Sequence, residues 1–253
     1  MTSALSISST ADHLARLSAP ARAFLKGPKK LLIGGAWRDA ASGRTFPVLD
    51  PATGEEFIRV AEGDKEDIDL AVAAARKAFQ NPSWRNMRAT DRERLMHRFA
   101  DLIEKHADEL AELEALDNGK SVVMARYVDM LMAVDCFRYM AGWPTKLQGA
   151  TLPASAPFLP PEARVFAYTT HEPVGVVGQI IPWNFPALMA AWKLAPALAT
   201  GCTVVLKPAE ETPLTALRIG ELALAFGHGN DILQGFVAAH GNHHHPVCRL
   251  RDR

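Results

Sequence analysis

Cysteine is scarce in this chain, and neither sign of charge dominates it. The 253 residues include three cysteines, Cys136, Cys202 and Cys248, an odd number without paired spacing. That argues against a disulfide framework and favours a reducing compartment, with the cytoplasm as the expected location. The 28 Lys and Arg residues balance the 28 Asp and Glu residues, so no basic field favours nucleic acid. Small molecules are therefore the expected partners.

Long apolar runs are also absent. None approaches the roughly twenty residues that cross a bilayer, so we expect no membrane span. Residues 1–30 are faintly typical of a transit peptide, but they lack the apolar centre of a secretory signal. The GxGxxG dinucleotide fingerprint does not occur either. With 48% hydrophobic residues, the chain nevertheless suffices for one large or two modest domains with buried cores.

The N-terminal part is predicted as a loose arm followed by short strands and then helices. Residues 1–28 form the arm, with a helical stretch over 11–25, and residues 29–150 form the next segment. Apolar runs with Gly and Pro turns predict short strands near 31–37 and 45–55.

Local signals mark where the helices of residues 29–150 begin and end. Asp64 and Asp67 resemble a capping box that opens the first helix, and Thr90 with Glu93 is predicted to cap the second. Gly119, after the third helix, is the expected left-handed terminator. A further helix over 122–142 is predicted to bury these apolar positions in the core: Met124, Val128, Leu131, Met132, Cys136 and Met140.

The C-terminal part changes to alternating strands and helices. Residues 151–172 are Pro-rich and then alternate apolar with polar residues, which predicts a β extension. Residues 173–227 read as strand 174–181, helix 185–199, strand 203–207 and helix 213–226. This βαβα unit predicts an α/β fold with an incomplete doubly wound, Rossmann-like parallel sheet. A nucleotide site is then expected at the carboxyl ends of its strands.

The turn after the first of these strands, within GQIIPWNFP, combines stiffness with a polar side chain. Pro182 and Pro186 fix φ and remove N–H donors, and Asn184 is the one side chain of the turn with both a donor and an acceptor. A rigid amide at the carboxyl end of a strand is a candidate functional group.

The second strand ends in a similar candidate. Lys207 and Glu210 follow it three residues apart, and a lysine donor with a carboxylate acceptor suits the hydroxyls of a ribose. The same two side chains could instead be surface residues that cap the helix beginning at Pro213.

Taken together, these stretches resemble the NAD(P)-dependent aldehyde dehydrogenase family. The resemblance is carried by IIPWNFP from Ile180, by WKLAPALATGCTVVLKPAEETP from Trp192, and by IGGAW and DPATGE nearer the N-terminus. It covers roughly 31–227. Two further stretches, AGWPTK and EPVGVV, are similar to enzymes that act on phenylacetaldehyde and related aldehydes.

The resemblance implies a role for each candidate residue. Asn184 would donate its amide to the aldehyde oxygen as half of an oxyanion hole, which must be held rigidly in advance to be effective. A carboxylate near the ribose would repel a 2′-phosphate, so NAD is favoured over NADP. The extension at 151–172 would serve oligomerisation, with further copies of this chain or a full-length paralogue as partners. The implied cofactor contacts are Ile181, Pro182, Trp183, Lys207 and Glu210.

The chain also departs from the family pattern. The resemblance implies roughly twice this length, with a Cys nucleophile and a Glu general base that are not found here. Residues 228–253 read as an aberrant His- and Arg-rich tail without a third apolar strand, and no metal site is expected from its adjacent histidines. We therefore expect an NAD-binding fragment that does not oxidise aldehydes alone. A non-catalytic subunit and a gene-model error are the alternatives.

Overall fold

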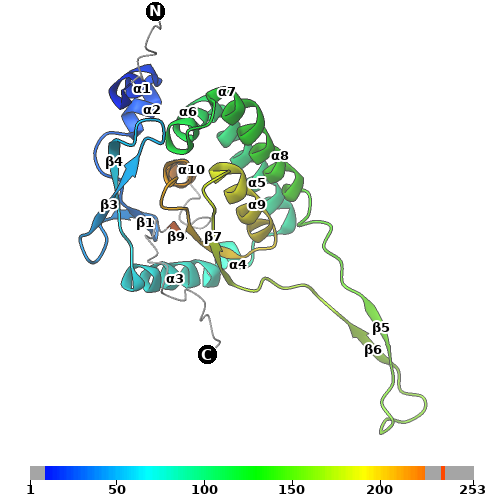
Figure 1. The fold of residues 1–253 in the computed structure, drawn as a ribbon. Helices are drawn as coiled ribbons and strands as arrows, with labels where there is room; N and C mark the ends of the chain where they lie inside the picture. The colour runs from blue at the N-terminus through cyan, green and yellow to red at the C-terminus, as the bar shows by residue number, and fades with distance from the viewer. Residues whose placement is uncertain (1–8, 226–234, 237–253) are drawn as a thin grey trace, which may run out of the picture.

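The computed structural model describes residues 9–225 together with 235 and 236. Its centre is a five-stranded sheet in the order β2-β1-β9-β8-β7 (Figure 1). β7 and β8 run parallel, as do β8 and β9, whereas β1 is antiparallel to both β2 and β9. The strands are β1 (Leu31–Ile33), β2 (Ala36–Arg38), β7 (Val176–Ile180), β8 (Thr203–Lys207) and β9 (Gly235–Phe236).

One expectation about this sheet is wrong. The parallel part does not stop at two strands, because β9, within the predicted aberrant tail, pairs with β8. β7 is the edge strand, and Ile180 at its end is exposed. β8 lies inside the sheet and is buried over its first four residues, as its apolar run predicts.

Helices cover both faces of the sheet, which confirms the doubly wound α/β class (Figure 1). On one face α3 (Lys65–Gln80) packs against β1, β7, β8 and β9. On the other face α9 (Pro186–Ala199) packs on β8 and α10 (Leu214–Ala225) on β9. Beyond α9 lie α5 (Ala89–Lys105) and α8 (Leu131–Ala141) as a further helical layer. No helix among the described residues has the length and apolarity of a membrane span.

The predicted helix starts are confirmed in one case and wrong in the other. Asp64 and Asp67 form the expected capping box at the start of α3. The next helices are α4 (Pro82–Arg85) and α5, which begins after Arg88 without a side-chain cap, so Thr90 and Glu93 lie inside the helix.

The described part of the N-terminal arm, residues 9–28, is packed rather than loose. It forms two helices, α1 (Thr10–Arg16) and α2 (Ala19–Phe24), because Ser18 begins a new helix as its N-cap. Phe24 is buried in a core cluster. The Ser18 amide also donates to Glu112 on α6 (Ala107–Asn118) at 2.8 Å. His13 Nδ1 lies 2.6 Å from the buried Asp50 carboxylate.

The third helix ends as expected, but the fourth is irregular. α6 (Ala107–Asn118) stops at Gly119, whose φ of 80° is left-handed. α7 (Val122–Met124) then passes through a π-helix, η1 (Ala125–Met130), into α8.

This helix buries a different face from the predicted one. The core prediction is wrong at several positions, beginning with Met124 before the π-helical stretch. Met124, Leu131 and Met132 are exposed, and Cys136 and Met140 are only partly buried. The buried positions are instead Ala125, Met130, Ala133, Val134, Phe137 and Ala141.

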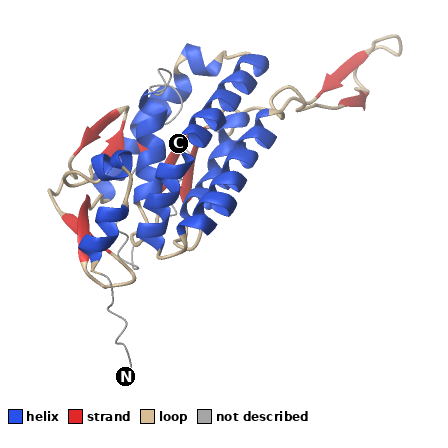
Figure 2. Ribbon diagram, turned by 90° about the horizontal axis from the view of Figure 1, so that it is seen from above, coloured by secondary structure: helices blue, strands red, loops and turns tan. Residues whose placement is uncertain are grey.

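Two hairpins stand apart from the main sheet. β3 (Thr45–Leu49) pairs with β4 (Glu56–Ala61), and β5 (Thr151–Ala154) pairs with β6 (Val165–Tyr168). The second hairpin confirms the predicted strand structure in 151–172. It projects far from the body of the molecule (Figures 1 and 2).

Candidate functional site

The two strands that carry the candidate residues end side by side. Ile180 pairs with Lys207 in the parallel register of β7 and β8. The Ile181 amide then donates to the Lys207 carbonyl at 2.9 Å, one residue past the end of β7. The structure thus brings the PWNFP turn and Lys207 together at the carboxyl ends of β7 and β8, as expected for parallel strands.

The turn itself presents polar and aromatic groups outward. Pro182 and Asn184 are exposed, and Trp183 has 58% of its surface accessible. Ile181 differs from these residues, because its side chain is 2% exposed and packs in the core. Among the described residues, nothing hydrogen-bonds to the side-chain amide of Asn184, which leaves its N–H groups available to a ligand.

The backbone carbonyls of the turn are held by side chains from elsewhere in the chain. Asn118 Nδ2 donates to the Trp183 carbonyl at 2.8 Å. Lys120 Nζ donates to the Asn184 carbonyl at 3.1 Å. Both residues flank Gly119 at the end of α6. Sequence reasoning missed them, because it treated the DNGK stretch only as a helix stop.

A buried group of carboxyls surrounds these contacts. Glu114 is fully buried and accepts from the Ala187 amide in the first turn of α9, at 3.2 Å from Oε2. Burial raises the pKa of Glu114 to about 7. Lys120 pairs with the buried Asp129 and lies 3.7 Å from Glu114 Oε1. Asp117, also buried, accepts from the Leu214 amide, and burial holds its pKa well above the ordinary value.

Lys207 and Glu210 form an ion pair beside the turn. Their Nζ and Oε1 atoms are 2.8 Å apart, with 14% and 23% of the side chains exposed, so neither side chain is fully buried. α10 begins at Leu214, and its first amide donates to Asp117.

The two described cysteines lie on other segments than the turn that carries Asn184. Cys202 is buried in the turn before β8, at the opposite end of the strand from Lys207. Cys136 lies on α8, its Sγ is 3.6 Å from the Ala191 carbonyl, and burial raises the pKa of its thiol. Within the described ranges no three ligating side chains gather into a metal site. Outside the described residues lie His240, His243, His244, His245 and Cys248.

An apolar depression lies between α8 and α9, close to the turn in sequence. Trp192 follows Asn184 by about two helical turns on α9. Its ring contributes to the depression together with side chains of α8. The lining residues are Met132, Asp135, Cys136, Tyr139, Met140 and Trp192.

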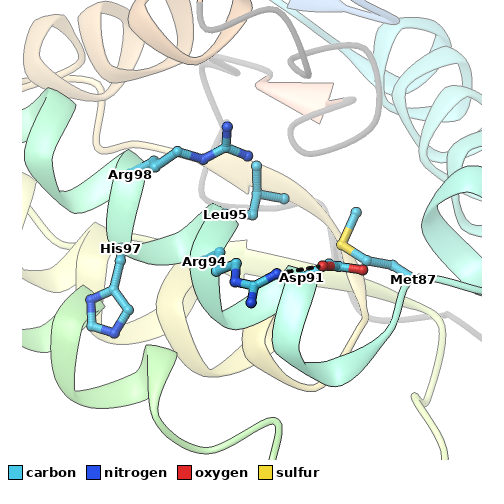
Figure 3. A pocket seen from close by; sticks show the side chains of 6 residues that line it. All are labelled: Met87, Asp91, Arg94, Leu95, His97 and Arg98. Atoms are coloured by element: carbon cyan, nitrogen blue, oxygen red, sulfur yellow. Dashed lines mark hydrogen bonds and ion pairs between the residues drawn. The ribbon is translucent and has the colours of Figure 1, made fainter.

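A second depression lies on α5 and shares no residue with the candidate site. In Figure 3 the Asp91 carboxylate points toward Arg94, and their side chains are 3.3 Å apart. Arg88 also pairs with Asp91, at 2.6 Å. The lining residues are Met87, Asp91, Arg94, Leu95, His97 and Arg98.

Comparison with known proteins decides the family. The model of the aldehyde dehydrogenase family matches residues 37–243. The chain belongs to the aldehyde dehydrogenase family. This match extends beyond residue 227, where the sequence prediction ended the resemblance, and it includes β9.

Individual members of the family are similar over most of this chain but over less than half of their own length. A phenylacetaldehyde dehydrogenase of Pseudomonas fluorescens is 53% identical over 83% of this chain and 42% of its own. A mitochondrial benzaldehyde dehydrogenase of Antirrhinum majus is 55% identical over 88% of this chain and 40% of its own. The NAD⁺ complex of a Bacillus cereus aldehyde dehydrogenase superposes with a TM-score of 0.80 at 47% identity. The match covers 87% of this chain and 44% of the other.

Proposed function

We propose that this chain supplies the NAD-binding part and the oxyanion donor of an enzyme that oxidises an aldehyde to a carboxylic acid. The observation that carries the proposal is the arrangement of side chains at the carboxyl ends of β7 and β8. Among the described residues no hydrogen bond engages the Asn184 side-chain amide, and the stiff turn that carries it lies at the same end of the sheet as the Lys207–Glu210 pair. Family membership supports the same reaction.

The side chains of Lys207 and Glu210 at these strand ends can bind a dinucleotide. Lys207 can donate to ribose hydroxyls and Glu210 can accept from them, and both are accessible. The Glu210 carboxylate would repel a 2′-phosphate, which favours NAD over NADP. When bound, NAD accepts the hydride that the aldehyde gives up. Pro182 and Trp183 would contact it through exposed surfaces, and Ile181 through its backbone, because its side chain is buried.

Asn184 would bind the aldehyde oxygen. A donor of this kind acts on the charge that develops as the carbonyl carbon becomes tetrahedral, and it is most effective when it does not have to reorient. We propose an aromatic aldehyde of the phenylacetaldehyde type. The two relatives named for aromatic aldehydes support this choice.

We further propose that this chain does not complete the reaction alone. Hydride leaves the aldehyde carbon only after a nucleophile has added to it. Cys202 is buried at the other end of β8, and the Cys136 thiol is disfavoured from ionising by its burial. Neither described cysteine is therefore placed to attack an aldehyde held at Asn184.

The β5–β6 hairpin is the proposed contact for oligomerisation. Phe166 and Tyr168 on β6 are 76% and 65% exposed, and their rings lie side by side with centroids 5.8 Å apart. Leu152 on the paired strand is also exposed. Aromatic and aliphatic side chains projecting together from a hairpin are typical of a subunit contact.

Calorimetric titration with NAD tests the cofactor site. Replacing Lys207 and Glu210 together by Ala should weaken NAD binding at least tenfold, because charge-assisted hydrogen bonds contribute about 1.5–3 kcal/mol each. The exposed Lys65–Asp69 pair on α3 is the matched control, since it is also a close Lys–carboxylate contact. Equal affinity of the Lys207 and Glu210 variant and the unmodified chain would refute the assigned site.

A further inference from the structure

The backbone on both sides of the Asn184 Cα atom is held by hydrogen bonds from side chains elsewhere in the chain. The Trp183 carbonyl belongs to the peptide plane before the Asn184 Cα atom, and the Asn184 carbonyl belongs to the plane after it. Asn118 holds the first at 2.8 Å and Lys120 the second at 3.1 Å. Because peptide units are planar, fixing both restricts φ and ψ of Asn184. The direction of its Cα–Cβ bond is thereby fixed as well.

The end of α6 has the shape that this double contact requires. Gly119 adopts a left-handed conformation with φ of 80°. A Cβ atom at this position would lie 2.7 Å from Pro51 Cγ, so a side chain does not fit here. The reversal at Gly119 lets Asn118 and Lys120, on either side of it, both reach the turn.

Lys120 is placed so that its charge is compensated while one donor reaches the turn. Its side chain is 16% exposed and pairs with the buried Asp129. The same ammonium lies 4.4 Å from the centre of the Phe185 ring, next to Asn184. An ion pair with this many fixed neighbours has little freedom to move, so the hydrogen bond to the Asn184 carbonyl is held in place.

We propose that Asn118 and Lys120 are positioning residues that orient the Asn184 amide toward the aldehyde oxygen. The proposal rests on the proposed role of Asn184 as oxyanion donor. Each residue acts through the backbone of the PWNFP turn. Thr212, whose Oγ1 lies 3.5 Å from the Trp183 carbonyl, supports the same oxygen more weakly.

Nitrogen-15 NMR relaxation of the full chain tests the proposal at the residue concerned. Asn184→Ala identifies the Asn184 signals by their loss. Asn118→Asp has nearly the same shape but presents an acceptor to the Trp183 carbonyl instead of a donor. We expect the heteronuclear NOE of the Asn184 backbone amide to fall and its signal to broaden or double. Asn86→Asp, at the exposed end of α4, is the control and should leave the Asn184 signals unchanged.

A second variant checks the other contact. Lys120→Met removes the donor to the Asn184 carbonyl, and Lys146→Met, which removes a lysine contact to the Gly142 carbonyl, is its control. Lys120 also balances the charge of buried carboxylates, so its loss is expected to destabilise the fold. Circular dichroism should therefore show equal folded fractions for Lys120→Met and the unmodified chain before their relaxation is compared. If it does not fold, Asn118→Asp decides alone, since Asn118 is only partly buried.

The outcomes separate this proposal from the proposed function. Unchanged Asn184 relaxation in Asn118→Asp overturns the positioning role, whatever the affinity for NAD. Loss of order at Asn184 in that variant supports the role even if NAD binding does not depend on Lys207 and Glu210. In that second case the cofactor assignment fails and the positioning of the turn stands.

Discussion

Replacing Glu114 by Gln should change how stability depends on pH. Burial raises the pKa of this carboxyl from 4.5 to about 7, so between these values the folded chain binds a proton that the unfolded chain has released. Because the folded state holds more protons, the free energy of unfolding of the unmodified chain falls as pH rises through this window. The variant carries a neutral amide and lacks this contribution.

The expected size follows from the same interval. Each unit between the folded and unfolded pKa values corresponds to ~1.4 kcal/mol. The stability of Glu114→Gln relative to the unmodified chain should therefore rise by about 3 kcal/mol from pH 4.5 to 7. Asp117, with a raised pKa of the same origin, and the Lys120–Asp129 pair are present in both chains, so their contributions largely cancel in the difference.

Urea unfolding followed by circular dichroism at several pH values measures this difference. Glu162→Gln, in the exposed loop of the β5–β6 hairpin, makes the same chemical change away from the core. Parallel stability curves for the unmodified chain and Glu114→Gln would refute the reasoning, and so would a loss of relative stability by the variant as pH rises.

Two further predictions concern single positions. Gly119→Ala should destabilise the chain by ~2 kcal/mol or more, because it combines a left-handed φ with a contact to Pro51; Gly27→Ala, with similar φ but open space, should cost only ~1 kcal/mol, and equal losses would contradict this. Trp84→Phe should cost about 2 kcal/mol in urea unfolding, because the buried Gly201 carbonyl loses its indole donor at 2.9 Å. The exposed Trp143 is its control, and a comparable loss from Trp143→Phe would contradict the reasoning.

Local and periodic signals in the sequence predicted much of this fold. The capping box at Asp64, the stop at Gly119 and the strand–helix–strand unit around Asn184 depend on neighbouring residues, and the structure confirms them. The core positions of the helix over 122–142 were predicted on the wrong face, because apolar side chains lie on both faces and helical spacing alone does not choose between them. β9 was missed because a two-residue strand carries almost no pattern of its own.

The candidate site shows the same division. Asn184 and Lys207 follow adjacent strands, so their proximity could be inferred from the topology of a parallel sheet. The contacts of Asn118 and Lys120 with the turn link residues more than sixty positions apart. Nothing in a single sequence pairs such residues, and the turn's support therefore became visible only in three dimensions.

The central position of β9 determines the order in which the strands of the sheet can pair. The hairpin of β1 and β2 and the parallel pair of β7 and β8 are joined by strand hydrogen bonds only through β9 within the described structure. β9 is the last of these strands to be synthesised, so a ribosome releases both halves of the sheet before the strand that unites them. Until residues 235 and 236 emerge, β1 and β8 each present an open edge. During synthesis, the helix α3, which packs on both halves, is the contact that can keep them together.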